Sequence, residues 1–406
     1  MTTSASLPEA TLQQADFKTN QVVPVVAAHF AHDIYTASVA PLLPVLIEKL
    51  SLSLTQAGAL SACLQIPSLL NPFIGYVADK VNLRYFVILA PAITATMLSS
   101  IGLTSNYYVL ALLFLVAGTS IAAFHATAPA MIGRVSGRQI GLGMSLFMVG
   151  GELAYTLGPL LAVWVVTVWT LDGYWRVVVI GWAASLLLFW RLKGNGKGVA
   201  ARPEEPGNLR LMVPELARLF IPMAFITLFR QPLMESLSTF LPTYLLGRGA
   251  SLWIAGASMS IFELSGIPGV LTSGWISDRL GRKPVLIFTS LASTIMALIF
   301  INVSGWLALI SLVALGFVSL SSMPVYLAMA QEHFPKNRAM ANSLVMMIVF
   351  VLRPLGTLAV GYMGDQLGLQ TAFYWGALAY LLTIPAILAL PGQVGKTSQI
   401  NPPIEP

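Results

Sequence analysis

The sequence predicts an all-α integral membrane fold, with about twelve transmembrane helices in two related six-helix halves. Of its 406 residues, 56% are hydrophobic and only 9% are charged, whereas soluble domains are close to one quarter charged. Apolar runs of about twenty residues recur along the chain, and each is long enough to cross a hydrocarbon core about 30 Å thick. Because unpaired backbone groups are costly in lipid, these runs are expected to be helices.

The expected spans divide into two halves that are joined by a polar segment. In the first half they are 22–47, 55–78, 84–104, 108–132, 140–168 and 173–192, and in the second 215–246, 251–277, 284–304, 306–330, 338–363 and 371–391. The predicted domains are therefore a tail at 1–21, a bundle at 22–192, a linker at 193–214, a bundle at 215–391 and a tail at 392–406. The linker is assigned by its glycine, proline and charged residues.

Lysine and arginine are distributed unevenly among the predicted connections. Most of the 22 lie in the tails, the linker and the alternate loops that would share one side of the membrane. Positive residues gather on the cytoplasmic side, so both termini are predicted to be cytoplasmic in a plasma or inner membrane. The bilayer thus accounts for the net charge of +6, and no nucleic-acid partner is expected. The single cysteine, Cys63, provides neither a disulfide framework nor a thiol metal site, and no metal is expected.

Two segments about 198 residues apart repeat each other. The segment that begins with Gly75 and contains Asp79 is similar to the one that begins with Gly274 and contains Asp278, and Gly158 in the fifth span recurs as Gly356 in the eleventh. Internal repeats of this kind are typical of transporters built from two parallel halves, with the substrate site between the halves near mid-bilayer.

The loops that contain Asp79 and Asp278 resemble the signature loop of the major facilitator superfamily. This resemblance implies a cytoplasmic latch that holds the outward-facing state. A carboxylate near a helix N-terminus is favoured by the partial positive charge there, and neighbouring bases can pair with it; alternatively, the bases only set the topology. The expected latch residues are Asp79, Lys80, Arg84, Arg134, Asp278, Arg279 and Arg282.

A narrower resemblance covers most of the chain. The segments 29–35, 65–72 with 75–76, 123–125, 145–151, 157–161 and 331–335 resemble the fosmidomycin-resistance branch of that superfamily. The resemblance implies export of drugs or metabolites in exchange for protons. The sequence departs from many proton antiporters because its fourth span lacks their arginine and has His125 as its only titratable residue.

Ionisable residues inside the spans are the candidate functional groups, because each costs at least about 2.5 kcal/mol at mid-bilayer. Arginine suits carboxylate, phosphate or phosphonate groups. Asp33 is favoured as the proton-coupling group because its span has no lysine or arginine before Lys49. The predicted coupling residues are Asp33, His32, His125 and Glu152, and the predicted substrate-binding residues are Arg230, His32, Tyr35, His125, Glu263, Arg353 and Glu235.

Structural roles remain open for several of these groups. Arg230 could neutralise Glu263 or Glu235, Arg353 could brace a bend at the adjoining proline, and His29 could be a polar packing residue. The preferred function is secondary active transport by a monomer: proton-coupled export of a small organic compound or drug by alternating access. A phosphonate-like anion is one expected class of substrate, and the proton gradient replaces any cofactor. The alternatives are an importer or uniporter of a small metabolite and, less favoured, a membrane-embedded enzyme.

Overall fold

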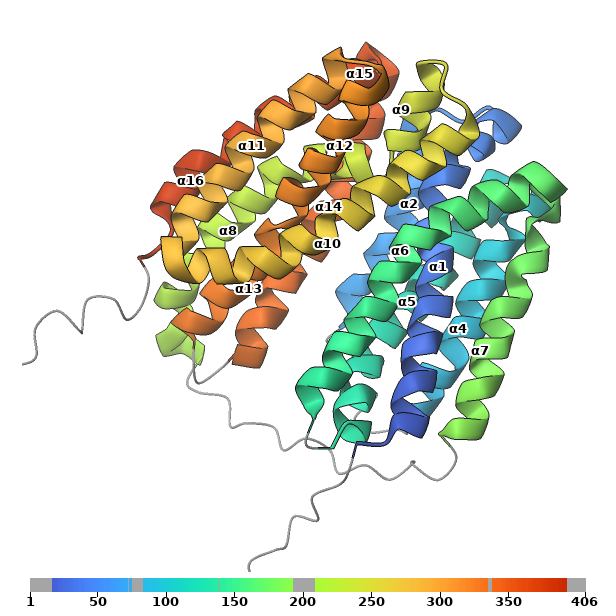
Figure 1. Ribbon diagram of the computed structural model, residues 1–406, viewed down its shortest axis with the longest axis horizontal. Coiled ribbons are helices and arrows are strands. Elements are labelled where there is room, and N and C mark those ends of the chain that lie inside the picture. The colour runs from blue at the N-terminus through green and yellow to red at the C-terminus, as the bar shows by residue number, and fades with distance from the viewer. Residues whose placement is uncertain are drawn as a thin grey trace, which may run out of the picture.

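The computed structural model describes residues 17–71, 73–74, 83–137, 139–192, 209–334 and 338–392, and within these ranges the regular structure is entirely helical. Two bundles lie side by side, one formed by α1 to α7 and the other by α8 to α16 (Figure 1). Among the described residues, 11 helical segments are long and apolar enough to cross a membrane. The predicted helical membrane fold in two halves is confirmed.

The N-terminal bundle follows the predicted spans closely. Its second span is α2 with the 3-10 helix η1, which falls short of the length of a full crossing within the described residues. Ser53 and Gln56 form a capping box that starts α2, and the Asn106 side chain caps α5. The elements are α1 (Thr19–Leu50), α2 (Leu54–Gln65), η1 (Ile66–Leu70), α4 (Leu83–Ser99), η2 (Ser100–Leu103), α5 (Tyr107–Val135), α6 (Ile140–Trp169), η3 (Asp172–Val177) and α7 (Val178–Arg191).

The C-terminal bundle differs from the prediction around its first span. Helix α8 already begins at Leu209, inside the predicted linker, and it ends at Ser238 rather than continuing to 246. A separate helix, α9, follows, with Pro242 in its first turn, where the missing N–H of proline is tolerated. The elements are α8 (Leu209–Ser238), α9 (Leu241–Gly247), α10 (Leu252–Leu280), α11 (Arg282–Asn302), α12 (Gly305–Leu320), α13 (Ser322–His333), α14 (Arg338–Leu367), α15 (Leu369–Leu381) and α16 (Thr383–Ala389).

Two glycines show the relation between the halves. A Cβ on Gly158 of α6 would lie 2.7 Å from the Cβ of Ala37 on α1, and a Cβ on Gly356 of α14 would lie 2.7 Å from the Cβ of Gln231 on α8. Both residues therefore let a helix approach the first helix of its own half at a distance that a larger side chain would prevent. The equivalent positions predicted from the repeat make equivalent contacts.

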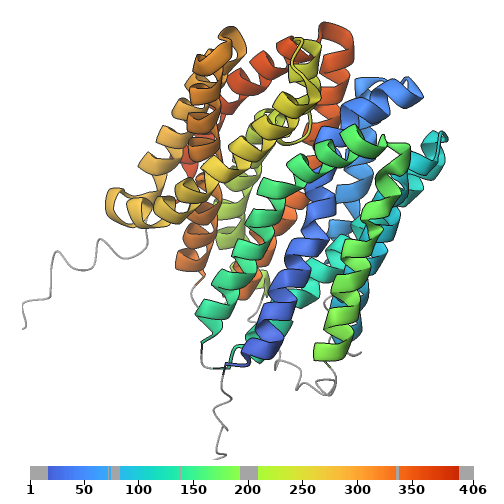
Figure 2. The same ribbon diagram turned by 45° about the vertical axis from the view of Figure 1, so that its right-hand side comes forward.

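The halves contact each other at the end remote from the start of α1. A Cβ on Gly58 of α2 would lie 3.0 Å from the carbonyl oxygen of Thr357 on α14. Asp365 of α14 accepts hydrogen bonds from the backbone amides of Leu54 at 2.7 Å and Thr55 at 2.8 Å. Figures 1 and 2 show the bundles converging at this end, beside α9, and diverging towards the end where α1 begins.

Candidate functional site

A cavity of about 320 Å³ lies between the two halves. Its wall includes apolar groups such as Met259 and Phe350, which surround a small number of polar and charged side chains. From the N-terminal half these are Asp33, Thr36, Ser61, Gln65, Ser68, Asn71, His125 and Tyr155, and from the C-terminal half Ser238, Thr239, Glu263 and Arg353. A cavity with a few convergent polar groups is the usual form of a small-molecule site.

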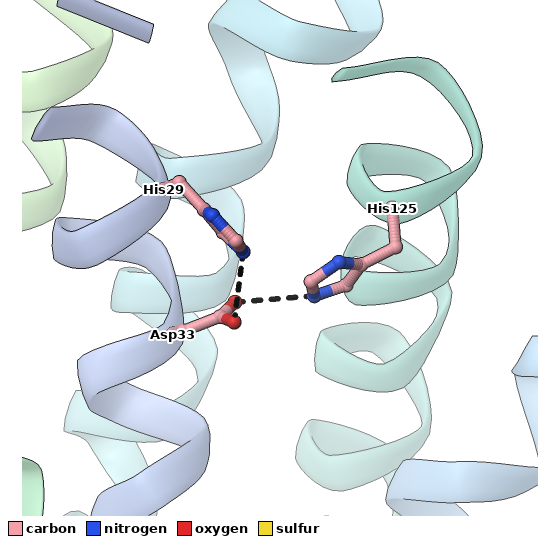
Figure 3. Close-up of side chains that lie close together, drawn as sticks. All are labelled: His29, Asp33 and His125. Carbon is pink, nitrogen blue, oxygen red and sulfur yellow. Dashed lines mark hydrogen bonds and ion pairs between the residues drawn. The ribbon is translucent and has the colours of Figure 1, made fainter. Parts of the chain in front are cut away.

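Asp33 of α1 is the centre of a cluster of histidines. Its Oδ1 lies 2.8 Å from Nδ1 of His32 and 3.1 Å from Nε2 of His125 on α5, and its Oδ2 lies 3.1 Å from Nε2 of His29. Figure 3 shows His29 and His125 converging on the carboxylate from α1 and α5. The span of Asp33 has no lysine or arginine before Lys49, and the partners that the structure gives this carboxylate are three imidazoles.

His29 is both packed and part of this cluster. Its Nδ1 donates to the carbonyl oxygen of Phe147 at 2.7 Å, and its ring stacks on the Phe147 ring with centroids 3.8 Å apart. Although Nε2 is within ion-pair distance of Asp33, its direction does not satisfy a hydrogen bond. Gly151 permits this packing, because a Cβ there would lie 2.8 Å from Cε1 of His29. The contact between His29 and Asp33 could have been expected from the sequence, because residues four apart lie on one face of a helix.

The ligand-type atoms of His29, Asp33 and His125 all lie within 4.8 Å of one another, so the structure brings together groups of the kind found in metal sites, which the sequence did not predict. Two of the three histidines around Asp33 make hydrogen bonds to its carboxylate directly.

On the opposite wall, Arg353 is held by a buried acid. Its Nε donates to Oε1 of Glu235 at 2.9 Å, and Oε2 of Glu235 accepts from the hydroxyls of Thr239 at 2.9 Å and Thr357 at 2.8 Å. The Glu235 side chain is 2% exposed and that of Arg353 is 37% exposed. Glu235 thus lies behind the cavity and orients Arg353, which lines it, as does Glu263.

Arg230 and Tyr35 do not line this cavity. Arg230 is buried and donates from Nη2 to the carbonyl oxygen of Ser319 at 3.0 Å. It pairs with neither Glu235 nor Glu263 within the described part of the chain, so the ion pair considered from the sequence is not formed. The Tyr35 hydroxyl donates to the carbonyl oxygen of Val177 at 2.6 Å and accepts from the amide of Gly181 at 3.0 Å, and so joins α1 to α7.

Two other predicted residues, His32 and Glu152, lie near the Asp33 cluster without lining the cavity. His32 is fully buried behind Asp33, and Glu152 is partly buried on α6 beside the glycine that contacts His29. Tyr155 lines the cavity but was not predicted as a site residue. The repeat could have identified it, because Tyr155 precedes Arg353 by the same 198 residues that separate Gly158 from Gly356.

The described latch residues form contacts within one half. Nη2 of Arg282 lies 2.5 Å from Oδ1 of Asp278 and 2.5 Å from Oε1 of Glu332, which links α10, α11 and α13. The guanidinium of Arg279 lies over the Trp275 ring at 3.8 Å, and Arg84 donates to the carbonyl oxygen of Leu192 at 3.3 Å. Asp79, Lys80 and the side chain of Arg134 lie outside the described residues.

Sequence comparisons find related membrane proteins. A family model described as Major Facilitator Superfamily matches residues 25–301 and 259–405. The Fosmidomycin resistance protein of Escherichia coli (strain K12) is 25% identical over 359 residues, with 85% of this chain and 86% of the relative covered. The phosphoglycerate transporter protein of Salmonella typhimurium is 24% identical over 376 residues, with 82% and 80% covered.

Solved structures share the fold at low identity. The nucleoside transporter NupG has a TM-score of 0.75 at 16% identity and covers 91% of this chain and 99% of its own. A bacterial homologue of the human lysosomal transporter Spinster, in an inward-facing and unoccupied conformation, has a TM-score of 0.73 at 15% identity, with 92% and 95% covered. A D-xylose-proton symporter has a TM-score of 0.75 at 13% identity, with 93% and 99% covered.

Proposed function

The chain belongs to the Major Facilitator Superfamily, and from this premise we propose that it exports a small organic anion or drug in exchange for protons. The two halves would expose the central cavity alternately to the two sides of the membrane. We further propose that the protein acts as a monomer in the plasma or inner membrane with both termini cytoplasmic. In that orientation, the halves meet at the outer end and diverge towards the cytoplasm.

The observation that carries this proposal is the division of charge across the cavity. One wall holds Asp33 and His125, which can bind and release protons, and the other holds Arg353 together with Glu263. A guanidinium fixed at Nε by Glu235 leaves its remaining N–H groups for a carboxylate, phosphate or phosphonate, the anions that suit arginine best. A substrate anion and the coupling proton would therefore bind to opposite halves of one cavity.

The preference for export and for phosphorus-bearing anions comes from the sequence relatives. One is named for resistance to fosmidomycin, a phosphonate, and another is named a phosphoglycerate transporter. Both names fit the arginine-containing wall. Uptake and uniport are the competing functions, and the direction of flux under an imposed gradient distinguishes them.

The test uses purified protein in liposomes with a pH difference across the membrane. Radiolabelled fosmidomycin, 3-phosphoglycerate and an uncharged sugar serve as probes, and protein-free liposomes and an Arg353→Ala variant serve as controls. We expect an anionic probe to move against the direction of proton flow, and the movement to stop when an ionophore removes the pH difference. Flux that ignores the pH difference would establish uniport, and anion movement in the same direction as the protons would establish symport; either result would refute the proposed exchange.

A further inference from the structure

A chain of hydrogen bonds leads from His32 to a backbone carbonyl on α4. Nε2 of His32 lies 3.1 Å from Oγ1 of Thr94, and that hydroxyl lies 2.9 Å from Oγ of Ser120 on α5. The Ser120 hydroxyl in turn lies 3.0 Å from the carbonyl oxygen of Ala90. All of the side chains in this chain are buried: His32 is 0%, Thr94 0% and Ser120 6% exposed.

The carbonyl at the end of this chain fixes the direction of every proton in it. A carbonyl oxygen only accepts, so Ser120 must donate its single hydroxyl proton to Ala90. Thr94 must then donate its own proton to Ser120, because a hydroxyl has only one. The oxygen of Thr94 is left as an acceptor for His32, and Nε2 of His32 therefore carries a proton.

The opposite nitrogen of His32 faces Asp33. Nδ1 and Oδ1 are 2.8 Å apart, which is a hydrogen-bond distance and requires a proton between the two atoms. With Nε2 already protonated, that proton makes His32 an imidazolium beside a carboxylate, or it makes Asp33 a neutral acid beside a neutral imidazole. If the proton leaves, a nitrogen lone pair faces a carboxylate oxygen and the bond is lost.

We propose that Thr94 and Ser120 are positioning residues that hold His32 in the Nε2–H tautomer, so that His32 and Asp33 remain hydrogen-bonded only while they share one coupling proton. This inference rests on the proposed proton exchange and assigns the device that links proton release to movement. After release, the Asp33 carboxylate is repelled by Nδ1 of His32, and its remaining partner on the cavity side is His125. Proton loss thus breaks the contact with His32 and leaves Asp33, which lines the cavity, bonded to His125.

The other titratable groups near Asp33 come from α1, α5 and α6. Nδ1 of His29 donates its proton to the carbonyl oxygen of Phe147. When His29 is neutral, its Nε2 therefore carries no proton and presents a lone pair to Asp33. His125 from α5 contacts the same carboxylate, and Glu152 and Tyr155 act on it electrostatically from α6. From α4, the group that faces His32 is the neutral hydroxyl of Thr94.

Two substitutions release the tautomer in different ways. In Ser120→Ala, Thr94 no longer has a hydroxyl acceptor and can donate to Nε2, so a neutral His32 can carry its proton on Nδ1 and bond to Asp33 without the coupling proton. In Thr94→Val, the acceptor for Nε2–H is lost. Both changes stabilise the unloaded pair relative to the loaded pair, whereas Thr94→Ser keeps the hydroxyl and retains the lock.

The first measurement is nitrogen NMR of the full chain in lipid nanodiscs, with ¹⁵N-labelled histidine and His32→Gln to assign the signal among the 4 histidines. We expect protonated Nε2 on His32 at every pH in the wild type and in Thr94→Ser, and a neutral Nδ1–H form at high pH in Ser120→Ala. A wild-type His32 in the Nδ1–H form would overturn the inference, whether or not transport is coupled to protons.

The second measurement is the pH profile of fosmidomycin flux in liposomes, after the wild type has been shown to transport it. In Thr94→Val and Ser120→Ala, the loaded His32–Asp33 pair loses about one hydrogen bond relative to the unloaded pair. Proton release therefore becomes easier, and the midpoint of the pH profile should move to lower pH by about 0.5–1 unit. The controls Thr96→Val and Thr119→Val remove hydroxyls that make no contact with His32, Thr94 or Ser120, and they should leave the midpoint unchanged. The Thr119 hydroxyl donates to Leu115 within α5, and the Thr96 hydroxyl donates to Ala92 and accepts from Nε1 of Trp182.

The two measurements separate the possible failures. Proton-driven flux with identical midpoints in wild type, Thr94→Val and Ser120→Ala would refute the positioning role while leaving the proposed exchange intact. A locked Nε2–H tautomer in a protein whose flux ignores the pH difference would refute the proposed exchange and, with it, the coupling part of this inference.

Discussion

Glu235 and Arg353 join α8 to α14, with Nε of the arginine 2.9 Å from Oε1 of the glutamate. The glutamate is almost completely buried, and two threonine hydroxyls also bond to it. Both carboxylate oxygens of Glu235 therefore accept hydrogen bonds within the protein. Its effect is to fix the plane of a guanidinium whose other edge faces the substrate space.

Removal of only one partner of this pair should be more damaging than removal of both. Arg353→Ala leaves a buried carboxylate without its cation, and we expect a loss of about 1–3 kcal/mol in the free energy of unfolding. Glu235→Gln in the same chain should recover part of that loss, because a neutral amide needs no cation. Thermal unfolding of the two single variants and the double variant gives the coupling energy; strictly additive losses would show that the pair contributes no interaction.

The role of Asp33 is tested by Asp33→Asn. An amide keeps the size of the side chain but cannot exchange a proton, so transport driven by a pH difference should fall to background while substrate binding and passive exchange persist. Flux assays and equilibrium binding to the same preparation check both parts. An Asp33→Asn protein that still concentrates substrate would move the coupling role to Glu152 or the histidines, and loss of binding would place Asp33 in contact with substrate.

Asp365 should control the balance between the two conformations. It caps the start of α2 from the other half, and the loss of such a cap costs about 1 kcal/mol. Asp365→Ala should therefore shift the ratio of the two states about fivefold towards opening at this end. Distances between spin labels on the two halves, introduced after Cys63→Ser, report the ratio. Asp172→Asn is the matched control, because the Lys49–Asp172 ion pair lies within one half.

The signature-loop prediction is tested at Asp278. Asp278→Asn should leave the protein folded, because this side chain is 61% exposed and Arg282 retains Glu332. Transport should nevertheless slow if this loop acts as a latch, because its loss would change the balance between the inward- and outward-facing states. Unfolding temperature and initial flux rate are measured on the same preparation. An unchanged rate would leave these charges with only a topological role.

The fold could be predicted from the sequence because the bilayer imposes a length and a polarity on every span. The boundaries followed hydropathy to within a few residues, as for the fourth span, predicted at 108–132 and found as α5, Tyr107–Val135. The start of α8 was missed because Leu209 lies among polar and charged residues that a hydropathy pattern assigns to a linker. The break after Ser238 was also missed, although Pro242 lies in the first turn of the helix that follows.

The sequence predicted site residues only where the residue type alone marks a functional group. Asp33, His125, Glu263 and Arg353 were selected because ionisable side chains are rare in spans, and all four line one cavity. The direction in which a side chain points cannot be read in the same way, so Arg230 and Tyr35 were included although they bond to neighbouring helices. Thr94 and Ser120 gave no signal, because hydroxyls in membrane helices usually bond to their own backbone.

The contact between the halves at Leu54, Thr55 and Asp365 is a polar one, made of backbone amides and a carboxylate. When this contact separates, each of those groups must be hydrated, and when it closes the same water molecules are released. The equilibrium between the two states consequently depends on water activity. Osmolytes that are excluded from protein surfaces favour the less hydrated form, so this end of the molecule is held closed more firmly in a concentrated medium than in a dilute one.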